Sequence, residues 1–188
     1  MSTTPEDLQR RDVLKTVAAG MAVGMAGLQP ALAVTEQPPP RGEPGDFDFL
    51  TGEWRIHNRF LEKGEWIEFP GEATVFGILQ GLASIEELRI PARGFSGMGL
   101  RLLDVENKVW CDHWVNAKSG VIAPPGQRGV FVDGVGTFTS EEKEGDTRVI
   151  HRGVWDRISK DSCRWFQGTS RDGGANWIDT WFMDWTRA

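Results

Sequence analysis

The stretch FLTGEWRIH, residues 49–57, marks the start of the folded domain. Gly52, a turn-forming residue, comes two positions before Trp54, and polar and apolar residues then alternate with the two-residue period of a β-strand. This period predicts a strand over 53–61. One face of it carries Trp54, Ile56, Asn58 and Phe60, and the other carries Arg55, His57, Arg59 and Leu61. If Trp54 points into a core, the Arg-His-Arg stripe faces solvent.

The remainder of the chain, from residue 46 onward, repeats this pattern. Short runs rich in Trp, Phe, Val and Ile alternate with turn residues, and no helical period is visible. These runs predict strands at 53–61, 65–69, 72–80, 83–90, 96–104, 108–116, 129–132, 135–141, 147–157, 162–170 and 176–186. A short helical turn is expected at 46–51. Pro124-Pro125 cannot lie inside a sheet, so 118–128 is expected to be an irregular loop.

A long antiparallel meander tends to close on itself, because closure removes exposed strand edges. The sequence therefore predicts an all-β, antiparallel up-and-down barrel of about eight to ten strands, wide enough for one small ligand. The net charge of -6 argues against binding to a phosphate backbone, which requires a basic face, so nucleic acid is not an expected partner.

The N-terminus has the pattern of an export signal. Arg10 and Arg11 precede an apolar run at 17–28, and the small-residue site Ala31-Leu32-Ala33 follows. The paired arginines resemble the twin-arginine signal. A retained membrane anchor and a hydrophobic helix of the mature protein are the alternatives, but the apolar run is too short and too rich in glycine to span a bilayer stably.

This pattern divides the chain into three parts. Residues 1–33 are expected to be a twin-arginine signal peptide, cleaved near Ala33 after contact with the twin-arginine export machinery. Residues 34–45 are rich in Pro and Gly and are expected to be a linker. Residues 46–188 are expected to form the barrel. The mature protein is then periplasmic or secreted.

The entry to the first strand resembles a known family signature. Gly52-Glu53-Trp54 is similar to the Gly-x-Trp signature of lipocalins and the wider calycin group. In that group the Trp closes one end of the barrel, and an Arg near the end of the last strand packs across it. The resemblance gives these roles to Trp54 and Arg187.

Five longer segments resemble a family of small bacterial proteins known as a domain of unknown function, DUF1579, which is regarded as lipocalin-like. The segments are FDFLTGEWRIHNR (47–59), ILQGLASIEELRI (78–90), LRLLDVENKVWCDHWV (100–115), FVDGVGTF (131–138) and SRDGGANWIDTWFMDWTR (170–187). The resemblance implies a lipocalin-like barrel but no settled activity. Related small barrels include haem-binding proteins, lipid or pigment carriers and a few isomerases, cyclases or hydratases.

The predicted strand 108–116 carries the most informative polar residues. Asp112 shares a face with Trp110 and Trp114, whereas His113 lies on the opposite face. A buried carboxyl between two Trp would have a raised pKa and could act as a general acid or base, although pairing with a neighbouring Arg is the alternative. The candidate catalytic residues are Asp112, His113 and Glu87. The candidate ligand-binding residues are Trp54, Asn58, Trp110, Trp114, Trp155 and Trp181.

The histidines and cysteines bear on cofactors. The chain has three His and no H-x-H, H-E-x-x-H or C-x-x-C motif, so no metal site and no cofactor are expected. Haem held by one proximal histidine, His113 or His151, is the alternative. Cys111 and Cys163 can pair in an exported protein or stay as free thiols.

Three functional hypotheses follow. The first is an exported lipocalin-like barrel that binds a small hydrophobic or aromatic molecule. The second is a metal-independent acid/base enzyme, a lyase, isomerase or hydratase, acting on a hydrophobic substrate in the same barrel. The third is an interaction module whose aromatic faces pack in a homodimer.

Overall fold

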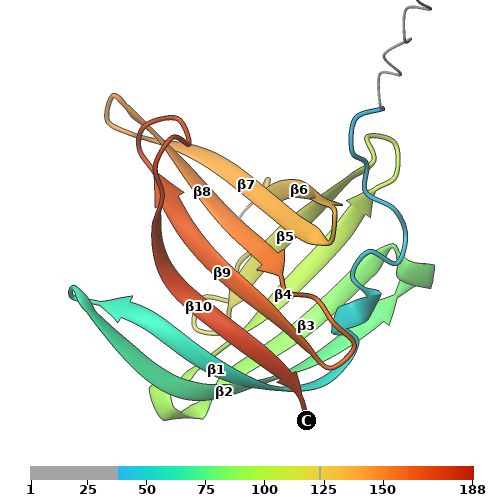
Figure 1. Cartoon of the computed structure of the whole chain (residues 1–188), viewed down its shortest axis with the longest axis horizontal. Coiled ribbons are helices and arrows are strands. Elements are labelled where there is room, and N and C mark those ends of the chain that lie inside the picture. The colour runs from blue at the N-terminus through green and yellow to red at the C-terminus, as the bar shows by residue number, and fades with distance from the viewer. Residues whose placement is uncertain (1–37, 123) are drawn as a thin grey trace, which may run out of the picture. The chain divides into compact units, whose positions relative to one another are not determined.

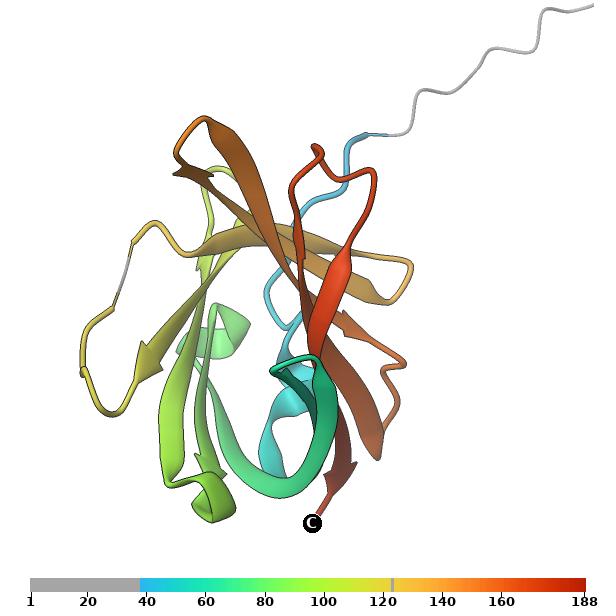
Figure 2. The same ribbon diagram turned by 90° about the vertical axis from the view of Figure 1, so that its left-hand side faces the viewer.

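The computed structural model describes residues 38–122 and 124–188, which form a closed barrel of ten antiparallel strands (Figures 1 and 2). Each strand pairs with its neighbours in sequence, and β1 pairs with β10. The strands are β1 (Gly52–Glu62), β2 (Glu65–Ile78), β3 (Ala83–Ile90), β4 (Phe95–Asp104), β5 (Val109–Asn116), β6 (Gln127–Val132), β7 (Val135–Glu144), β8 (Thr147–Asp156), β9 (Ser162–Ser170) and β10 (Ile178–Arg187). The predicted all-β up-and-down barrel is confirmed.

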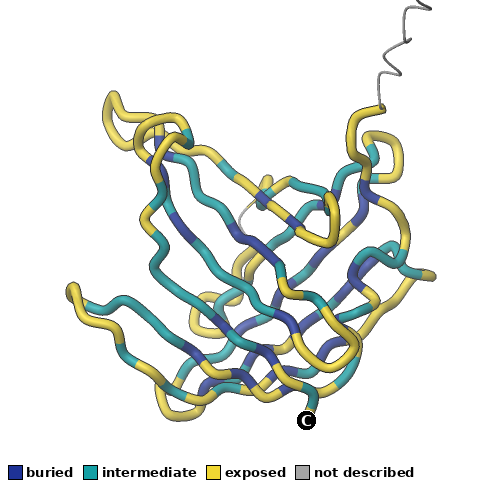
Figure 3. Tube along the Cα trace, viewed as in Figure 1, coloured by how far each residue is buried: buried dark blue, intermediate teal, exposed yellow. Residues whose placement is uncertain are grey.

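Three short 3-10 helices, η1 (Asp48–Leu50), η2 (Leu79–Gly81) and η3 (Pro91–Arg93), complete the secondary structure of the described residues. No helix in this part of the chain has the length and apolar character needed to cross a bilayer. The predicted signal peptide and the first residues of the predicted linker lie outside the described residues. Figure 3 shows buried and more exposed positions alternating along the strands, as expected when one face of each strand lines the interior.

The prediction of separate strands at 65–69 and 72–80 is wrong, because both runs belong to the single strand β2. Pro70 lies between these two runs, and a proline cannot donate a hydrogen bond to a sheet ladder. It lies opposite His57 of β1, whereas pairing with β3 begins only at Glu72. Pro70 therefore has a neighbouring strand on one side only, and a proline is tolerated at such an edge position.

One end of the barrel is closed by Phe47–Leu50, the segment called the plug below. Phe47 and Leu50 are buried, and the Phe47 ring centroid lies 4.9 Å from that of Trp110 and 5.0 Å from that of Phe131, both edge-on. The buried Trp54 indole donates from Nε1 to the Leu50 carbonyl at 2.6 Å. The plug is therefore continuous with the aromatic core.

Arg187, at the end of β10, explains the Gly-x-Trp entry. Its guanidinium carbon lies 3.9 Å from the ring centroid of Trp54, and it donates hydrogen bonds to the carbonyls of Thr51 and Phe49 at 2.5 and 2.6 Å. Gly52 has a φ of 129°, and a Cβ there would lie 2.6 Å from Arg187 Nη1. Only glycine fits both this backbone conformation and this close approach. Trp54 and Arg187 thus occupy the positions that the family resemblance implies.

The barrel wall has one thin junction, called the seam below. Three residue pairs join β5 to β6, namely Trp110–Gly129, Cys111–Arg128 and Asp112–Gln127. In contrast, eight pairs join β4 to β5. Residues 113–116 of β5 have no partner on β6. The segment 117–122 that follows β5 swings outward in Figure 2. The predicted irregular loop at 118–128 falls at this connection, although β6 already begins at Gln127.

Candidate functional site

A cavity of about 650 Å³ lies inside the barrel. Aromatic side chains dominate its wall, which includes Trp114, Trp155, Trp165, Trp181 and Trp185. The polar residues of the wall include Glu86, Arg101, Asp112, Gln127, His151 and Gln167. A mostly apolar cavity of this volume with a few inward polar groups has the properties of a small-molecule site.

Arg101 is the central polar group. It lies on β4, is 3% exposed, and its guanidinium carbon is 5.2 Å from the ring centroids of both Phe47 and Trp155. This contact with the plug defines the deep end of the cavity. Because the guanidinium is flat and delocalised, it packs on aromatic faces at both sides while its N–H groups stay available for hydrogen bonds.

Two carboxylates face Arg101. Its Nη2 donates to Glu86 of β3, which is also buried, and its Nε lies 3.6 Å from an oxygen of Asp112. Strand register produces this cluster, since Asp112 is the direct partner of Arg101 across β4 and β5, and Glu86 is the partner of Gly99 across β3 and β4. A Cβ at Gly99 would lie 3.0 Å from Arg101 Nη2, so the missing side chain makes room for the guanidinium.

Burial raises the pKa of Asp112 to about 6; the nearby Arg101 lowers the pKa of this carboxyl, and Glu86 raises it further. Burial also lowers the pKa of Arg101, but the Glu86 and Asp112 carboxylates outweigh this effect, so the pKa of Arg101 lies above its ordinary value. Arg101 therefore remains a cation, whereas Asp112 changes its charge slightly below neutral pH.

The raised pKa of Asp112 predicts a stability that falls as pH rises. Between the unfolded value of 3.8 and the folded value of about 6, the folded protein binds more protons than the unfolded chain at this residue, so the free energy of unfolding decreases with pH. The loss amounts to roughly 3 kcal/mol across this window, at 1.36 kcal/mol per pKa unit.

Urea unfolding of the wild type and of Asp112→Asn at a series of pH values measures this loss. Asparagine has no charge to bury, so the variant is expected to gain stability relative to the wild type as pH rises between about 4 and 6. Other carboxyls contribute equally to both proteins and cancel in the difference. A stability difference that stays constant across the window would contradict the raised pKa.

The deep end of the cavity carries buried N–H donors that have no hydrogen-bond partner among the described residues. These are Nε and Nη1 of Arg101 and the indole Nε1 atoms of Trp155 and Trp185. Both indoles are 1% exposed, and their ring centroids are 5.3 Å apart. Buried polar groups in native proteins are nearly always hydrogen-bonded, so these donors on neighbouring residues of the cavity wall are suited to an acceptor that enters the cavity.

The structure divides the predicted ligand-binding residues into two groups. Trp114, Trp155 and Trp181 line the cavity. Asn58 is fully buried behind the wall, where its Oδ1 accepts a hydrogen bond of 3.0 Å from Trp181 Nε1. It therefore positions Trp181 and does not line the cavity itself.

Trp54 and Trp110 also lie outside the cavity wall and belong to the closed end of the barrel. Trp110 is fully buried, contacts Phe47 of the plug and donates from Nε1 to Asp46 Oδ2 at 3.0 Å. The sequence placed both Trp on inward faces correctly, but inward faces build the closed end as well as the cavity.

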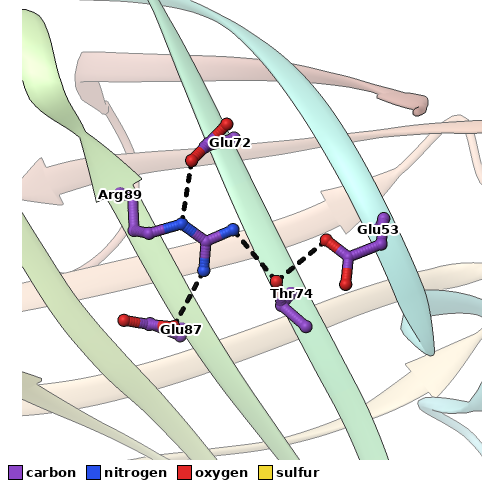
Figure 4. A network of polar contacts seen from close by, with 5 residues as sticks. All are labelled: Glu53, Glu72, Thr74, Glu87 and Arg89. Atoms are coloured by element: carbon purple, nitrogen blue, oxygen red, sulfur yellow. Dashed lines mark hydrogen bonds and ion pairs between the residues drawn. The ribbon is translucent and has the colours of Figure 1, made fainter.

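The predicted catalytic residue Glu87 is corrected by the structure, because it lies on the outer face of the barrel. Its carboxylate accepts a hydrogen bond of 2.8 Å from Arg89, which also bonds Glu72 and Thr74 in the surface network of Figure 4. The Glu87 side chain is 64% exposed. Its neighbour Glu86 points inward instead, on the face that also carries the buried Leu88.

His113 and His151 lie near the seam. His113 lines the cavity together with its neighbour Asp112, and a Cβ at Gly126 would lie 2.7 Å from its Nδ1. His151 has partners at both ring nitrogens, with Nε2 2.8 Å from Glu142 and Nδ1 3.3 Å from Thr169 Oγ1. His151 therefore has no free ring nitrogen for a haem iron, whereas the buried Nδ1 of His113 has no hydrogen-bond partner among the described residues.

The other candidate groups carry no chemistry in this arrangement. No cluster of three or more His, Cys, Asp or Glu side chains suited to a metal ion occurs within residues 38–122 and 124–188. Cys111 and Cys163 are both free. Burial raises the pKa of the Cys163 thiol to about 12, so it stays protonated and unreactive.

Comparisons with known proteins leave the family open. No family model matches the chain. No curated protein matches it either. Among solved structures, the chain is similar to the crystal structure of Rv2717c from M. tuberculosis, with 12% sequence identity over 78% of this chain and 99% of that chain and a TM-score of 0.47. The DUF1579 resemblance stays a prediction, and a likeness at this level supports no conclusion about function.

Proposed function

We propose that the protein is an exported lipocalin-like barrel, of the DUF1579 type that its sequence resembles, and that it binds a small hydrophobic or aromatic molecule in the cavity. The wall formed by five Trp side chains around about 650 Å³ carries this proposal. Each indole offers a large rigid apolar surface that loses little conformational entropy on contact with a ligand. The barrel wall is already formed, so binding does not have to order it.

The open end of the cavity suits a flat ring. Trp114 stacks on Phe95 with ring centroids 5.9 Å apart and an interplanar angle of 11°, and it is 40% exposed. A Cβ at Gly97 would lie 2.3 Å from the Trp114 ring, so glycine lets the indole lie flat on β4. Trp181 faces Phe95 from the opposite wall, with ring centroids 6.1 Å apart. A planar molecule that enters the cavity at this end can stack on the exposed part of Trp114 and contact Trp181, which both line the cavity.

The predicted twin-arginine signal is consistent with a binding protein that leaves the cytoplasm folded. Its export would place the barrel in the periplasm or outside the cell. Small apolar molecules are poorly soluble there and benefit from a carrier, because burial of each methylene group is worth about 0.8 kcal/mol.

Blocking the cavity is expected to abolish ligand binding. Gln167 lies on the wall between Gly153 and Trp181, and Gln167→Trp adds an indole to that space. The dissociation constant of the fluorescent probe anilinonaphthalene sulfonate should rise at least about tenfold, which is about 1.4 kcal/mol. The measurement is a fluorescence titration of the full chain, combined with native mass spectrometry for a co-purifying molecule.

The matched control for this titration is Phe166→Trp. Phe166 is the neighbouring residue on β9 and stacks on Phe182 on the outer face of the barrel, so this change adds an indole outside the cavity. The control should bind the probe like the wild type. Equal probe affinity in the wild type and in Gln167→Trp would place binding on the outer surface and contradict the proposal.

Asp112 favours an acid/base enzyme as the second candidate function. Its pKa of about 6 lies close to neutral pH, where a carboxyl exchanges protons efficiently with a bound substrate, and it lies in an aromatic cavity beside a fixed cation. An enzyme of this kind would lose at least about 100-fold in turnover on Asp112→Asn while it still binds its substrate. A carrier has no turnover to lose, so this variant separates the two functions.

A further inference from the structure

We infer, on the basis of the proposed function, that the deep end of the cavity is a subsite for a carboxylate. The ligand is then an apolar or aromatic acid whose rings contact the Trp wall and whose carboxylate accepts hydrogen bonds from Arg101, Trp155 and Trp185.

The unsatisfied donors carry this inference. Arg101 uses Nη2 on Glu86, but its Nη1 has no partner among the described residues, although the side chain is only 4% exposed. The indole N–H groups of Trp155 and Trp185 are also buried and also lack a hydrogen-bond partner among the described residues. A buried donor without an acceptor destabilises the protein, and a ligand that supplies the acceptor recovers this free energy on binding.

The three residues that carry these donors are neighbours in the cavity wall. The Arg101 guanidinium lies 5.2 Å from the Trp155 ring centroid, and the Trp155 and Trp185 centroids are 5.3 Å apart. All three residues line the cavity. A carboxylate has two oxygens with about four acceptor positions, so a single carboxylate matches a cluster of several donors better than one carbonyl oxygen does.

The donor set excludes a cationic head group at this point. An ammonium ion has donors and no acceptor, so it would leave the indole N–H groups unpaired and would lie against the Arg101 cation. A neutral amide could accept a hydrogen bond, but hydrogen bonds to charged groups are stronger than those between neutral groups. The carboxylate is therefore the favoured class.

The charges around Arg101 couple carboxylate binding to a proton. Asp112 faces Arg101 of β4 and Glu86 of β3, and its partner on β6 is the neutral Gln127. Further along the wall, Glu142 of β7 and His151 of β8 contact each other.

With both carboxylates ionised, Arg101, Glu86 and Asp112 together carry one negative charge, which repels an incoming carboxylate. Protonation of Asp112 removes that charge. We therefore expect one proton to be taken up with the ligand when binding occurs above the pKa of Asp112, which lies at about 6.

Isothermal titration calorimetry with three matched probes tests this inference on the full chain. The probes are naphthoate, naphthamide and naphthylmethylammonium, which share a ring system and differ in the head group. Naphthoate should bind the wild type at least about tenfold more tightly at about pH 5 than at about pH 7.5. In Asp112→Asn its affinity should be high at both pH values, whereas the affinity of naphthamide should change by less than about threefold between the two proteins.

Asp184→Asn is the matched control. It removes the same charge from β10 at a position between the inward-facing Met183 and Trp185, so its side chain lies on the outer face. The pH dependence of naphthoate binding should persist in this control.

The outcomes separate the carboxylate subsite from the proposed function. Equal binding of the three probes, without an effect of Asp112→Asn, would overturn the carboxylate subsite and leave a general hydrophobic carrier. Tighter binding of the ammonium probe would overturn it in favour of a cationic ligand. Binding of none of the probes would count against the proposed function as well as the subsite.

Discussion

Replacement of Arg101 by methionine is expected to lower the free energy of unfolding by about 3–5 kcal/mol at neutral pH, the usual loss when one partner of a buried ion pair is removed. Glu86 is 3% exposed and would keep its charge without a cation beside it. Methionine resembles the arginine stem in length, so the loss reports the missing charge more than a missing volume.

Urea unfolding followed by tryptophan fluorescence measures this loss, and a double variant provides the control. Arg101→Met combined with Glu86→Leu removes both members of the ion pair and should recover most of the stability, because a well-packed apolar pair often replaces a buried ion pair at no cost. A loss below about 1 kcal/mol in Arg101→Met would show that water reaches the pair as it does at a surface.

The second large effect is expected at the closed end, where Trp54→Ala should cost about 3–5 kcal/mol. The Trp54 side chain is 1% exposed, packs edge-on against Trp185 with centroids 5.8 Å apart, and lies under the Arg187 guanidinium. Alanine would leave a cavity, an unpaired Leu50 carbonyl and an arginine without its aromatic partner. Trp54→Ala should therefore unfold at a much lower denaturant concentration than the wild type.

Trp66→Ala is the matched control for this variant. Trp66 is the same residue type on β2, but it is 48% exposed and contacts Phe182 on the outer face. Its replacement should cost less than about 1 kcal/mol, as for most surface substitutions. An equal loss of stability in Trp54→Ala and Trp66→Ala would contradict the expectation that Trp54 stabilises the closed end of the barrel.

Most of the barrel fold could be predicted from the sequence. Alternation along 53–61 placed Trp54 inside and His57 outside, and the same period placed Asp112 on the inner face of β5. These assignments succeeded because each strand has one apolar face and one polar face, so parity follows from the residues themselves. The Gly-x-Trp entry also pointed to the position of Arg187, which lies far away in the sequence.

The site was harder to predict from the sequence than the barrel, because it depends on contacts between strands. In 83–90 both faces carry an aliphatic residue and a glutamate, so local alternation alone did not choose between Glu86 and Glu87. The choice is made by Arg101, which reaches Glu86 across the β3–β4 pairing. Pairing register between strands, unlike the face of one strand, cannot be read from a short run of residues.

The seam between β5 and β6 gives the barrel a preferred direction of local opening. Elsewhere in the wall, separating two strands breaks a longer ladder of backbone hydrogen bonds. At the seam, only three residue pairs join β5 to β6. Fluctuations of a protein open first where the fewest buried contacts and ladder bonds have to be broken. A breathing motion at the seam would expose the cavity beside Asp112 and Gln127 and would leave the packing of Trp54 and Arg187 undisturbed. Exchange of molecules with the interior can then proceed through the side of the barrel, between β5 and β6.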